Sequence, residues 1–395
     1  MGKPKIRFKG YEDDWEQRKL GEVAQEFKSG NSLKADEIDI TGDYPVYGGN
    51  GLRGYTSTYN HDGEYALIGR QGALCGNMNY SVGKAYFTEH AVVVKADENN
   101  DTRFLYYMLD TMNLGQYSDQ SAQPGLAVNK LVKLENQFPM KEEQQRIGWY
   151  FSNIDHLITL HQRKCEETKS LKKYMLQKMF PENGNCVPKI RFSGFADAWE
   201  QRKLKDYLEV SREKNKTESY GKEDVLSVSG EHGIVNQIEF QGRSFAGVSV
   251  ANYGVVEAGD VVYTKSPLKS NPYGIIKTNK GKTGIVSTLY AVYKPRMNTN
   301  SEFVQIYFEL DSRMNSYMHP LVNKGAKNDM KVSDENALKG PVAFPELEEQ
   351  NAITQYFDKL DRLITLHQRK CYRFIDIALD AWEQRKWIDV VDIST

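Results

Sequence analysis

Residues 142–165 read EEQQRIGWYFSNIDHLITLHQRKC, and residues 348–371 read EEQNAITQYFDKLDRLITLHQRKC. Sixteen of these 24 positions are identical at an offset of 206 residues. A Phe-Pro pair precedes each copy, at Phe138 and Pro139 and again at Phe344 and Pro345. A repeat of this kind indicates that the chain contains two related structural units.

A second repeat lies closer to the start of each unit. Residues 4–20 (PKIRFKGYEDDWEQRKL) match residues 188–204 (PKIRFSGFADAWEQRKL) at 13 of 17 positions, and a partial copy, DAWEQRK, occupies 380–386. The regions between the repeats, about 20–138 and 204–344, share almost no sequence, and the second is longer by 22 residues. Similar frames around dissimilar inserts indicate one scaffold that carries two different surfaces.

The block 141–179 has no proline and one glycine, which favours a long helix. Its apolar and small residues recur mostly at alternating steps of four and three, the period of a coiled-coil seam. The predicted seam residues are Ile147, Phe151, Ile154, Ile158, His161, Cys165, Thr168, Leu171, Met175 and Met179, and then Ile353, Phe357, Leu360, Ile364, His367, Cys371, Phe374, Ala378 and Ala381. About 39 helical residues span roughly 58 Å. A helix this polar needs a partner for its apolar stripe, so we expect the two copies to pair antiparallel.

These patterns predict an α+β chain of two pseudo-repeated mixed α/β domains joined by two long antiparallel coiled-coil helices. We place the first domain at 1–140, the first helix at 141–187, the second domain at 188–345, and the second helix with a C-terminal tail at 346–395. Within the inserts we expect short helices at 102–112, with Thr102 near its start, and at 303–310, capped by Ser301. We also expect helices that end at each Phe-Pro pair, and a polar basic loop at 265–282.

Composition excludes several classes of protein. The net charge is −1, with 39% apolar and 27% charged residues, which is typical of a globular chain and not of a disordered or fibrous one. No apolar run is long enough to span a membrane, and no apolar run follows the basic N-terminus as in a secretory signal. The four cysteines form no CxxC pair, which favours a reduced, cytoplasmic location without structural zinc. They are Cys75, Cys165, Cys186 and Cys371.

No convincing catalytic set is present. The sequence contains no HExxH, GxSxG or phosphate-binding GxxxxGK[ST] motif. Asn271-Pro272-Tyr273 partly resembles a methyltransferase motif, and we interpret it as a turn. His161 with Cys165, and His367 with Cys371, have i, i+4 spacing, and we interpret them as seam residues and not as metal ligands. We therefore predict a non-catalytic binding protein with no metal site and no cofactor of its own.

On these features the chain resembles the DNA specificity subunit of type I restriction–modification systems. The resemblance covers nearly the whole length, and its most telling residues are YPVYGGNG at 44–51, GRQG at 69–72, and the Phe-Pro…Glu-Gln…Ile…Leu-Ile block in both halves. It implies two target-recognition domains, each reading one half of a split, asymmetric site in double-stranded DNA. It also implies helices that set the gap and dock two modification subunits. Those partners bind S-adenosylmethionine and methylate adenine, while restriction subunits use ATP and Mg to translocate and cut DNA.

Base reading needs side chains that form bidentate contacts in the major groove. Our candidates in the first insert are Asn50, Arg53, Arg70, Gln71, Asn77, Asn79 and Lys84. In the second insert they are Lys265, Lys269, Asn271, Tyr273, Lys277, Lys324, Lys327 and Asn328. For partner docking we select residues that lie off the seam, Trp149, Tyr150 and Tyr356.

Charge leaves two alternatives open. The first insert holds nine basic against fifteen acidic residues, a net −6, whereas the second has a net +2. A DNA-binding domain normally presents a basic face, so an acidic insert also fits a coiled-coil scaffold without DNA affinity. A self-sufficient DNA methyltransferase is the other alternative.

Overall fold

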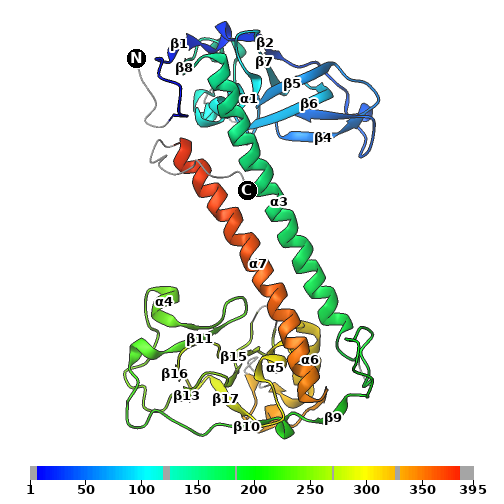
Figure 1. Ribbon diagram of the computed structural model, residues 1–395, viewed down its shortest axis with the longest axis vertical. Helices are drawn as coiled ribbons and strands as arrows, with labels where there is room; N and C mark the ends of the chain where they lie inside the picture. The colour runs from blue at the N-terminus through cyan, green and yellow to red at the C-terminus, as the bar shows by residue number, and fades with distance from the viewer. Residues whose placement is uncertain (1–6, 119–124, 183–184, 269–270, 325–329, 383–395) are drawn as a thin grey trace. The chain divides into compact units, whose positions relative to one another are not determined.

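The structure is a computed structural model that describes residues 7–118, 125–182, 185–268, 271–324 and 330–382. The chain divides into two compact units (Figure 1). The first unit is Met1–Gln162 with Gln368–Thr395, and the second is Arg163–His367. Both unit boundaries fall inside the long helices α3 (Lys141–Lys178) and α7 (Leu347–Trp382), so each helix contributes to both units.

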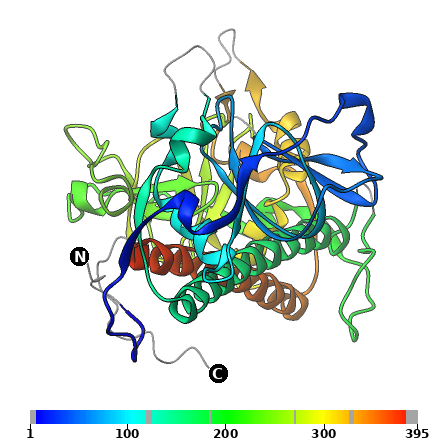
Figure 2. The ribbon, with the colours of Figure 1, turned by 90° about the horizontal axis from the view of Figure 1, so that it is seen from above.

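A six-stranded sheet forms the body of the first unit, in the order β2-β7-β5-β6-β3-β4 (Figure 2, blue to cyan). Its pairs are antiparallel except for β3 with β6. The strands of this unit are β1 (Glu16–Lys19), β2 (Ala24–Ser29), β3 (Tyr44–Gly48), β4 (Gly51–Thr56), β5 (His61–Gly69), β6 (Met78–Phe87), β7 (Ala91–Ala96) and β8 (Glu135–Phe138). Its short helices are α1 (Thr102–Thr111) and α2 (Val128–Leu131).

Side-chain alternation along β5 divides the core of this unit between the two faces of the sheet. Ala66 and Ile68 face the main core, where they join Phe104, Leu105 and Met108 of α1. Tyr65 and Leu67 face the opposite side and pack with Phe87. Because both faces are covered, the register of β5 is fixed, and the residue that follows the strand, Arg70, has a defined position.

The second unit uses smaller sheets. Its largest has four strands in the order β10-β17-β14-β15, and β13 pairs with β16, β11 with β12, and β18 with β19. The strands are β9 (Glu200–Lys203), β10 (Leu208–Val210), β11 (Leu226–Ser229), β12 (Gly233–Asn236), β13 (Gly254–Val256), β14 (Val261–Thr264), β15 (Ile276–Thr278), β16 (Gly284–Val286), β17 (Tyr290–Pro295), β18 (Asn323–Lys324), β19 (Met330–Lys331) and β20 (Pro341–Phe344). The short helices are α4 (Gln237–Gln241), α5 (Ser301–Tyr307) and α6 (Asp311–Met318).

The two long helices meet antiparallel in both units, and the predicted fold class is confirmed. In the first unit, Phe151 and Ile154 of α3 pack with Phe374 and Ile377 near the end of α7. In the second unit, Leu176 and Met179 of α3 join Ile353, Phe357 and Leu360 from the start of α7 in one core.

The predicted seam is wrong at Leu171, which is 43% exposed. Leu176, which the alternating pattern missed, is buried instead. The reason is that a straight helix turns every 3.6 residues and drifts from a strict 3.5-residue repeat. Lys172 takes the inward position, and its Nζ donates to Glu309 at 2.7 Å and to Asp361 of α7 at 2.6 Å.

The residues before each Phe-Pro pair are strands, so the predicted helices there are wrong. β8 pairs antiparallel with β1, and β20 pairs in the same way with β9. Residues 16–19 and 200–203 carry the same sequence, EQRK, and the register is equivalent, with Glu16 opposite Phe138 and Glu200 opposite Phe344. Each two-stranded ladder therefore brings the two ends of its insert together.

A buried ion pair ties each ladder to a long helix. Arg7 donates Nε and Nη2 to the two carboxylate oxygens of Glu143, both at 2.7 Å, and Arg191 makes the same bidentate contact with Glu349 at 2.7 Å. The side chains of Glu143 and Glu349 are 0% and 2% exposed. Each hydrogen-bonded carboxylate raises the pKa of its arginine. Both glutamates lie in the first helical turn, where the helix dipole also favours a negative charge.

The neighbouring glutamine clamps the short helix of each insert. Gln144 Oε1 accepts from the backbone N–H of Asp101 at 3.0 Å, and Gln350 Oε1 accepts from that of Asn300 at 3.0 Å. Asp101 and Asn300 are the residues that cap α1 and α5. Thr102 is the first residue of α1, as expected, whereas the cap predicted at Ser301 is one residue late. The two inserts are therefore attached to the frame in the same way despite their different sequences.

An aromatic contact completes each frame. Trp15 packs edge-on against Phe104 at 6.2 Å, and Trp199 packs edge-on against Phe303 at 5.9 Å. Phe138 and Phe344, which end β8 and β20, lie against the same two phenylalanines. Among the described residues, no helix is long and apolar enough to cross a membrane.

We expect Arg7→Met to destabilise the first unit by about 3 kcal/mol, because it leaves Glu143 as a buried carboxylate without its ion-pair partner. Urea denaturation followed by tryptophan fluorescence measures the change. The matched control is Arg163→Met, which removes an exposed pair with Glu167 and should cost less than about 1 kcal/mol. Equal losses in the two variants would contradict the role assigned to the buried pair, and Arg7→Met with Glu143→Leu should lose less than Arg7→Met alone.

Candidate functional site

Two glycine-rich stretches cross at one place in the first unit. A Cβ added to Gly69 at the end of β5 would lie 2.4 Å from the Gly49 carbonyl oxygen and 2.6 Å from that of Leu74. Only glycine allows backbones to approach this closely. The turn between β3 and β4 is therefore held against the loop that follows β5.

Backbone hydrogen bonds fix the loop after β5. Arg70 N–H donates to the His90 carbonyl at 2.9 Å, and the Arg70 carbonyl accepts from Leu126 N–H at 2.9 Å. Gly69 N–H donates to the Asn77 carbonyl at 2.8 Å, which closes the loop between β5 and β6. The loop is therefore anchored at both ends. Between them Gln71, Ala73 and Leu74 are exposed, whereas the Cys75 thiol donates to the Arg70 carbonyl at 3.3 Å.

The structure brings most of the candidates in the first insert to this crossing. Asn50, Arg53, Gln71 and Asn77 are exposed, and Arg70 and Asn79 are half-buried. Asn79 Oδ1 lies 2.8 Å from where a Cβ on Gly51 would be, and the Arg53 side chain lies against Gly48. We call residues 48–53, 69–79 and His90 the double-loop surface. Lys84 instead places its Nζ 4.6 Å from the centre of the Tyr59 ring, a contact that raises its pKa.

Local charge on the double-loop surface differs from that of the insert as a whole. The Arg53 side chain lies against Gly48, and the Arg70 guanidinium donates to the Glu89 carbonyl at 3.4 Å, beside His90, although the insert carries a net −6. The carboxylate of Glu89 adjoins the surface, with one oxygen 3.6 Å from His90 Nε2. The few basic residues of the insert are thus partly gathered on one side, as an acidic domain needs if it is to bind a polyanion.

His90 also belongs to this surface, although it is not among the site residues predicted from the sequence. Its Nδ1 lies 3.1 Å from Gln71 Oε1. The contact arises because Gly69 is opposite Ala91 in the β5–β7 ladder, which brings His90 beside the loop. No local pattern around His90 predicts this, since the ladder joins residues about twenty positions apart.

The second unit contains an equivalent loop with different residues. Lys265 N–H, directly after β14, donates to the Leu289 carbonyl at 2.9 Å, as Arg70 does to His90. Thr264 N–H donates to the Ile275 carbonyl at 2.9 Å, as Gly69 does to Asn77. A strand, an anchored loop and a second strand therefore occur in both inserts, at 69–77 and at 264–275.

The structure does not expose all the candidates in the second insert. Asn271 is 5% exposed and donates to Asp311 at 2.8 Å, and Tyr273 is 7% exposed. Lys277 is 9% exposed within β15, and burial lowers its pKa. The predicted continuous basic loop at 265–282 is thus wrong, because 276–278 form a strand whose polar side chains are held inside the unit. These three side chains are buried and do not form part of the surface.

The remaining candidates in the second insert divide into two groups. Lys265 reaches the surface in part and forms an ion pair with Asp334 at 3.0 Å. Lys269, Lys327 and Asn328 lie outside the described residues, and so does the side chain of Lys324 in β18. They remain predictions from the sequence.

Two of the three predicted docking residues are internal contacts. Tyr150 packs edge-on against Phe8 at 5.8 Å, and Tyr356 packs edge-on against Phe192 at 5.8 Å. Phe8 and Phe192 are equivalent positions in the repeated segments 4–20 and 188–204. The structure therefore gives both tyrosines a role in holding these segments to the helices, whereas Trp149 remains 63% exposed.

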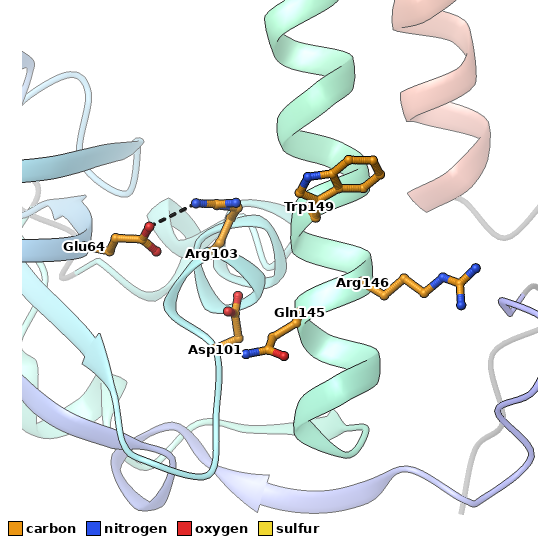
Figure 3. Close-up of a pocket in the computed structure, with 6 residues that line it drawn as sticks. All are labelled: Glu64, Asp101, Arg103, Gln145, Arg146 and Trp149. Carbon is orange, nitrogen blue, oxygen red and sulfur yellow. Dashed lines mark hydrogen bonds and ion pairs between the residues drawn. The ribbon is translucent and has the colours of Figure 1, made fainter. Parts of the chain in front are cut away.

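Trp149 stands at the rim of a hollow of about 530 Å³ in the first unit (Figure 3). Glu64 and Arg103 form an ion pair at 3.0 Å on one side of it, and Gln145 and Arg146 belong to α3 on the other. An exposed indole beside a charged hollow is a surface suited to contact with another protein.

Metal ligation finds no support in the part of the chain that the structure describes. No group of three or more His, Cys, Asp or Glu side chains is placed there to hold a metal ion. His161 is 8% exposed and stacks on Phe374 at 5.8 Å, as a helix-packing residue would.

Comparison with known proteins agrees with this architecture. Residues 12–170 match the family described as type I restriction modification DNA specificity domain. The specificity subunit of the type I restriction enzyme EcoprrI from Escherichia coli is 42% identical over 156 residues, which cover 38% of this chain and 39% of that protein. The putative MjaX specificity subunit of Methanocaldococcus jannaschii is 22% identical over 412 residues, covering 91% of this chain and 89% of that protein.

A solved structure extends the likeness to the whole chain. The type I restriction–modification S subunit from M. genitalium superposes with a TM-score of 0.64 over 98% of this chain and 99% of that one, at 14% sequence identity. At this identity the likeness shows the fold. Together with the matched domain, it confirms the predicted resemblance to type I specificity subunits.

We expect Gly69→Ala to open the crossing, because the new Cβ would meet two carbonyl oxygens at under 3 Å. Amide hydrogen exchange of Gly69, Arg70 and Gly76 measures this, and we expect exchange at least tenfold faster than in the wild type. Gly125→Ala is the control, since its nearest neighbour would be 3.9 Å away. Unchanged protection in Gly69→Ala would show that the two stretches are not held together by this contact.

We expect Lys277→Met to stabilise the second unit by about 1 kcal/mol at pH 7, because burial disfavours the charged amine. The pKa of Lys277 in the folded state is below its usual value, so the penalty is fully present below that pKa. It diminishes as pH rises through the folded pKa toward the unfolded one, and the gain from the variant should diminish with it. Urea denaturation at pH 7 and pH 10 measures both effects.

The control for Lys277→Met is Lys280→Met, which removes an exposed pair with Glu302 and should change stability little at either pH. A marked loss of stability in Lys277→Met would show that the amine is well paired inside the unit.

Proposed function

We propose that this chain is the DNA-specificity subunit of a type I restriction–modification complex, and that each unit reads one half of a split DNA site. The observation that carries the proposal is the pair of equivalent anchored loops, 69–77 and 264–275, on one repeated frame. The matched specificity domain over 12–170 supports it. The chain itself is proposed to have no catalytic role.

The double-loop surface has the side chains that base reading needs. Arginine pairs bidentately with guanine, and asparagine and glutamine pair with adenine in the major groove. Arg53, Gln71 and Asn50 are exposed at the crossing, and the backbone beneath them is fixed by hydrogen bonds and close packing. Rigid support matters because discrimination between bases depends on geometry, whereas contacts to phosphates set position and salt dependence.

Two loops with unlike residues on like frames predict an asymmetric site. The loop at 70–76 begins with Arg-Gln-Gly, whereas the one at 265–274 begins with Lys-Ser-Pro. Equivalent loops that present different donors and acceptors would select different base pairs, so the two half-sites should be unrelated in sequence.

The helices support the proposal that two modification subunits dock on this chain. Residues 157–165 and 363–371 are identical over nine positions, and they include Leu363 and Leu366, which are 44% and 45% exposed. Burial does not explain the identity of exposed leucines. Two copies of one partner, each requiring the same surface, would explain it. S-adenosylmethionine would be held by those modification subunits, and ATP and Mg by restriction subunits.

Co-expression with the cognate modification subunit, followed by long-read mapping of methylated adenine, tests the proposal. We expect one split motif with two unlike halves. Gln71→Ala combined with Arg53→Gln should relax or abolish recognition of one half only, and Lys133→Gln, an exposed substitution elsewhere in the same insert, should leave the motif intact. A stable complex that adds no methylation would favour a scaffold without DNA affinity. Methylation by the chain alone would favour a self-sufficient methyltransferase.

Affinity for a DNA duplex that carries the mapped motif should fall steeply with salt. Each phosphate contact contributes about −0.9 to the slope of log K against log salt concentration. Arg53→Gln should reduce the magnitude of the slope by about one if Arg53 contacts a phosphate, or leave the slope unchanged and lower specificity if it reads a base. Fluorescence anisotropy across a salt series measures the slope, and a flat response in the wild type would contradict phosphate contacts.

A further inference from the structure

We infer that the two docking faces of this chain are unequal, and that the first unit binds a modification subunit more tightly than the second. The inference rests on the proposed docking of two identical subunits, and it concerns the residues that differ between the two helix copies. Eight of the 24 positions in the repeated block differ. Six of these differing positions on α3 are not buried. They are Gln145, Arg146, Trp149, Ser152, Asn153 and His156.

These six positions form one stripe that continues into the identical segment. Residues 149, 153, 156 and 160 follow one another at steps of four, three and four, so they lie on the same face of α3. The equivalent face of α7 carries Gln355, Lys359, Arg362 and Leu366. Both stripes therefore end at an equivalent leucine, Leu160 in α3 and Leu366 in α7. They differ in the helical turns before that leucine.

The first stripe has the two residue types that dominate binding energy at interfaces. Trp149 is 63% exposed, and Arg146, also exposed, lies over the Phe8 ring with its Cζ 4.9 Å from the ring centre. Trp and Arg are enriched among the few residues that contribute most to protein–protein affinity. The second stripe has Gln355 and Ala352 at the same positions, and neither offers a comparable contact area. Its own arginine, Arg362, lies seven residues beyond Gln355 and pairs with Asp358 at 2.8 Å.

The neighbouring insert reverses its charge between the two units. The hollow beside Trp149 is bordered by Arg103, which lies two positions after the capping residue of α1 and pairs with Glu64 at 3.0 Å (Figure 3). The equivalent position on α5 is Glu302, which pairs with Lys280 at 2.6 Å. Both caps are held by the same glutamine clamp, so the two positions correspond. Identical partner surfaces would therefore meet an arginine in one unit and a glutamate in the other.

The side-chain amides at one pair of equivalent positions also make different contacts in the two faces. Asn351, the counterpart of Gln145, accepts from Asn300 Nδ2 at 2.7 Å and is engaged within its own unit. Gln145 instead lines the hollow. Beside the hollow, the first face thus has Trp149, Arg146 and Gln145, whereas the second has the shorter Gln355, Ala352 and Asn351 at the matching positions.

Titration of the full chain with the purified cognate modification subunit tests the inference, with native mass spectrometry as the readout. We expect two sites whose dissociation constants differ at least tenfold, so that a 1:1 complex accumulates before the 2:1 complex. Trp149→Gln should weaken the tighter site at least tenfold and bring the two sites close together. Gln355→Trp should strengthen the weaker site. Tyr372→Gln, which removes a 69% exposed aromatic residue from another face of α7, should leave both sites unchanged.

The possible failures can be told apart. Two equal sites in the wild type, or an unchanged gap in Trp149→Gln, would overturn the inference and leave the docking proposal standing. Absence of any complex with the wild-type chain would overturn the docking proposal itself, and this inference with it. Because Trp149 is exposed, its variant should keep the wild-type thermal melting curve, which excludes misfolding as the cause of weaker binding.

Discussion

The rest of the structure depends on one constraint, a bidentate ion pair that occurs in each half of the chain. It joins an arginine of the repeated segment to a glutamate in the first turn of the long helix. Arg7 with Glu143, and Arg191 with Glu349, are both closed at 2.7 Å with the carboxylates buried. A buried pair of this kind adds little net stability compared with apolar side chains of similar volume, but breaking it is costly. Its consequence here is geometric, because only one docking of the segment satisfies both charges.

From that docking, the attachment of each insert follows. The segment leads directly into β1 or β9, which pairs with β8 or β20, the strand that closes the insert. The insert therefore leaves the frame and returns to it at neighbouring positions, whatever sequence lies between. The adjacent glutamine, Gln144 or Gln350, then holds the capping residue of the insert's own helix. Two inserts with almost no common sequence can thus be carried in the same orientation relative to their helices.

Much of this architecture could be predicted from the sequence, because its signals are local or repeated. The 3.5-residue pattern predicted both long helices, and the two copies predicted their pairing. The strands β8 and β20 could not be predicted, since each has four residues and its partner lies more than a hundred positions away. The candidate site shows the same limit. Gly69 and Arg70 are recognisable in sequence, whereas His90 reaches Gln71 only through the β5–β7 register, and Lys277 is polar in sequence yet buried in β15.

The separation of frame from loop explains how the residues of the loop could change without loss of the fold. Both ends of the loop 70–76 are held by backbone hydrogen bonds, which do not depend on the side chains between them. Substitutions at exposed positions such as Ala73 should therefore cost little stability. Side chains brace the loop in both units: Gln71 contacts His90 in the first, and Asn271 bonds to Asp311 and Lys265 to Asp334 in the second. Residues that brace a loop cannot be replaced as freely as residues that only point away from it.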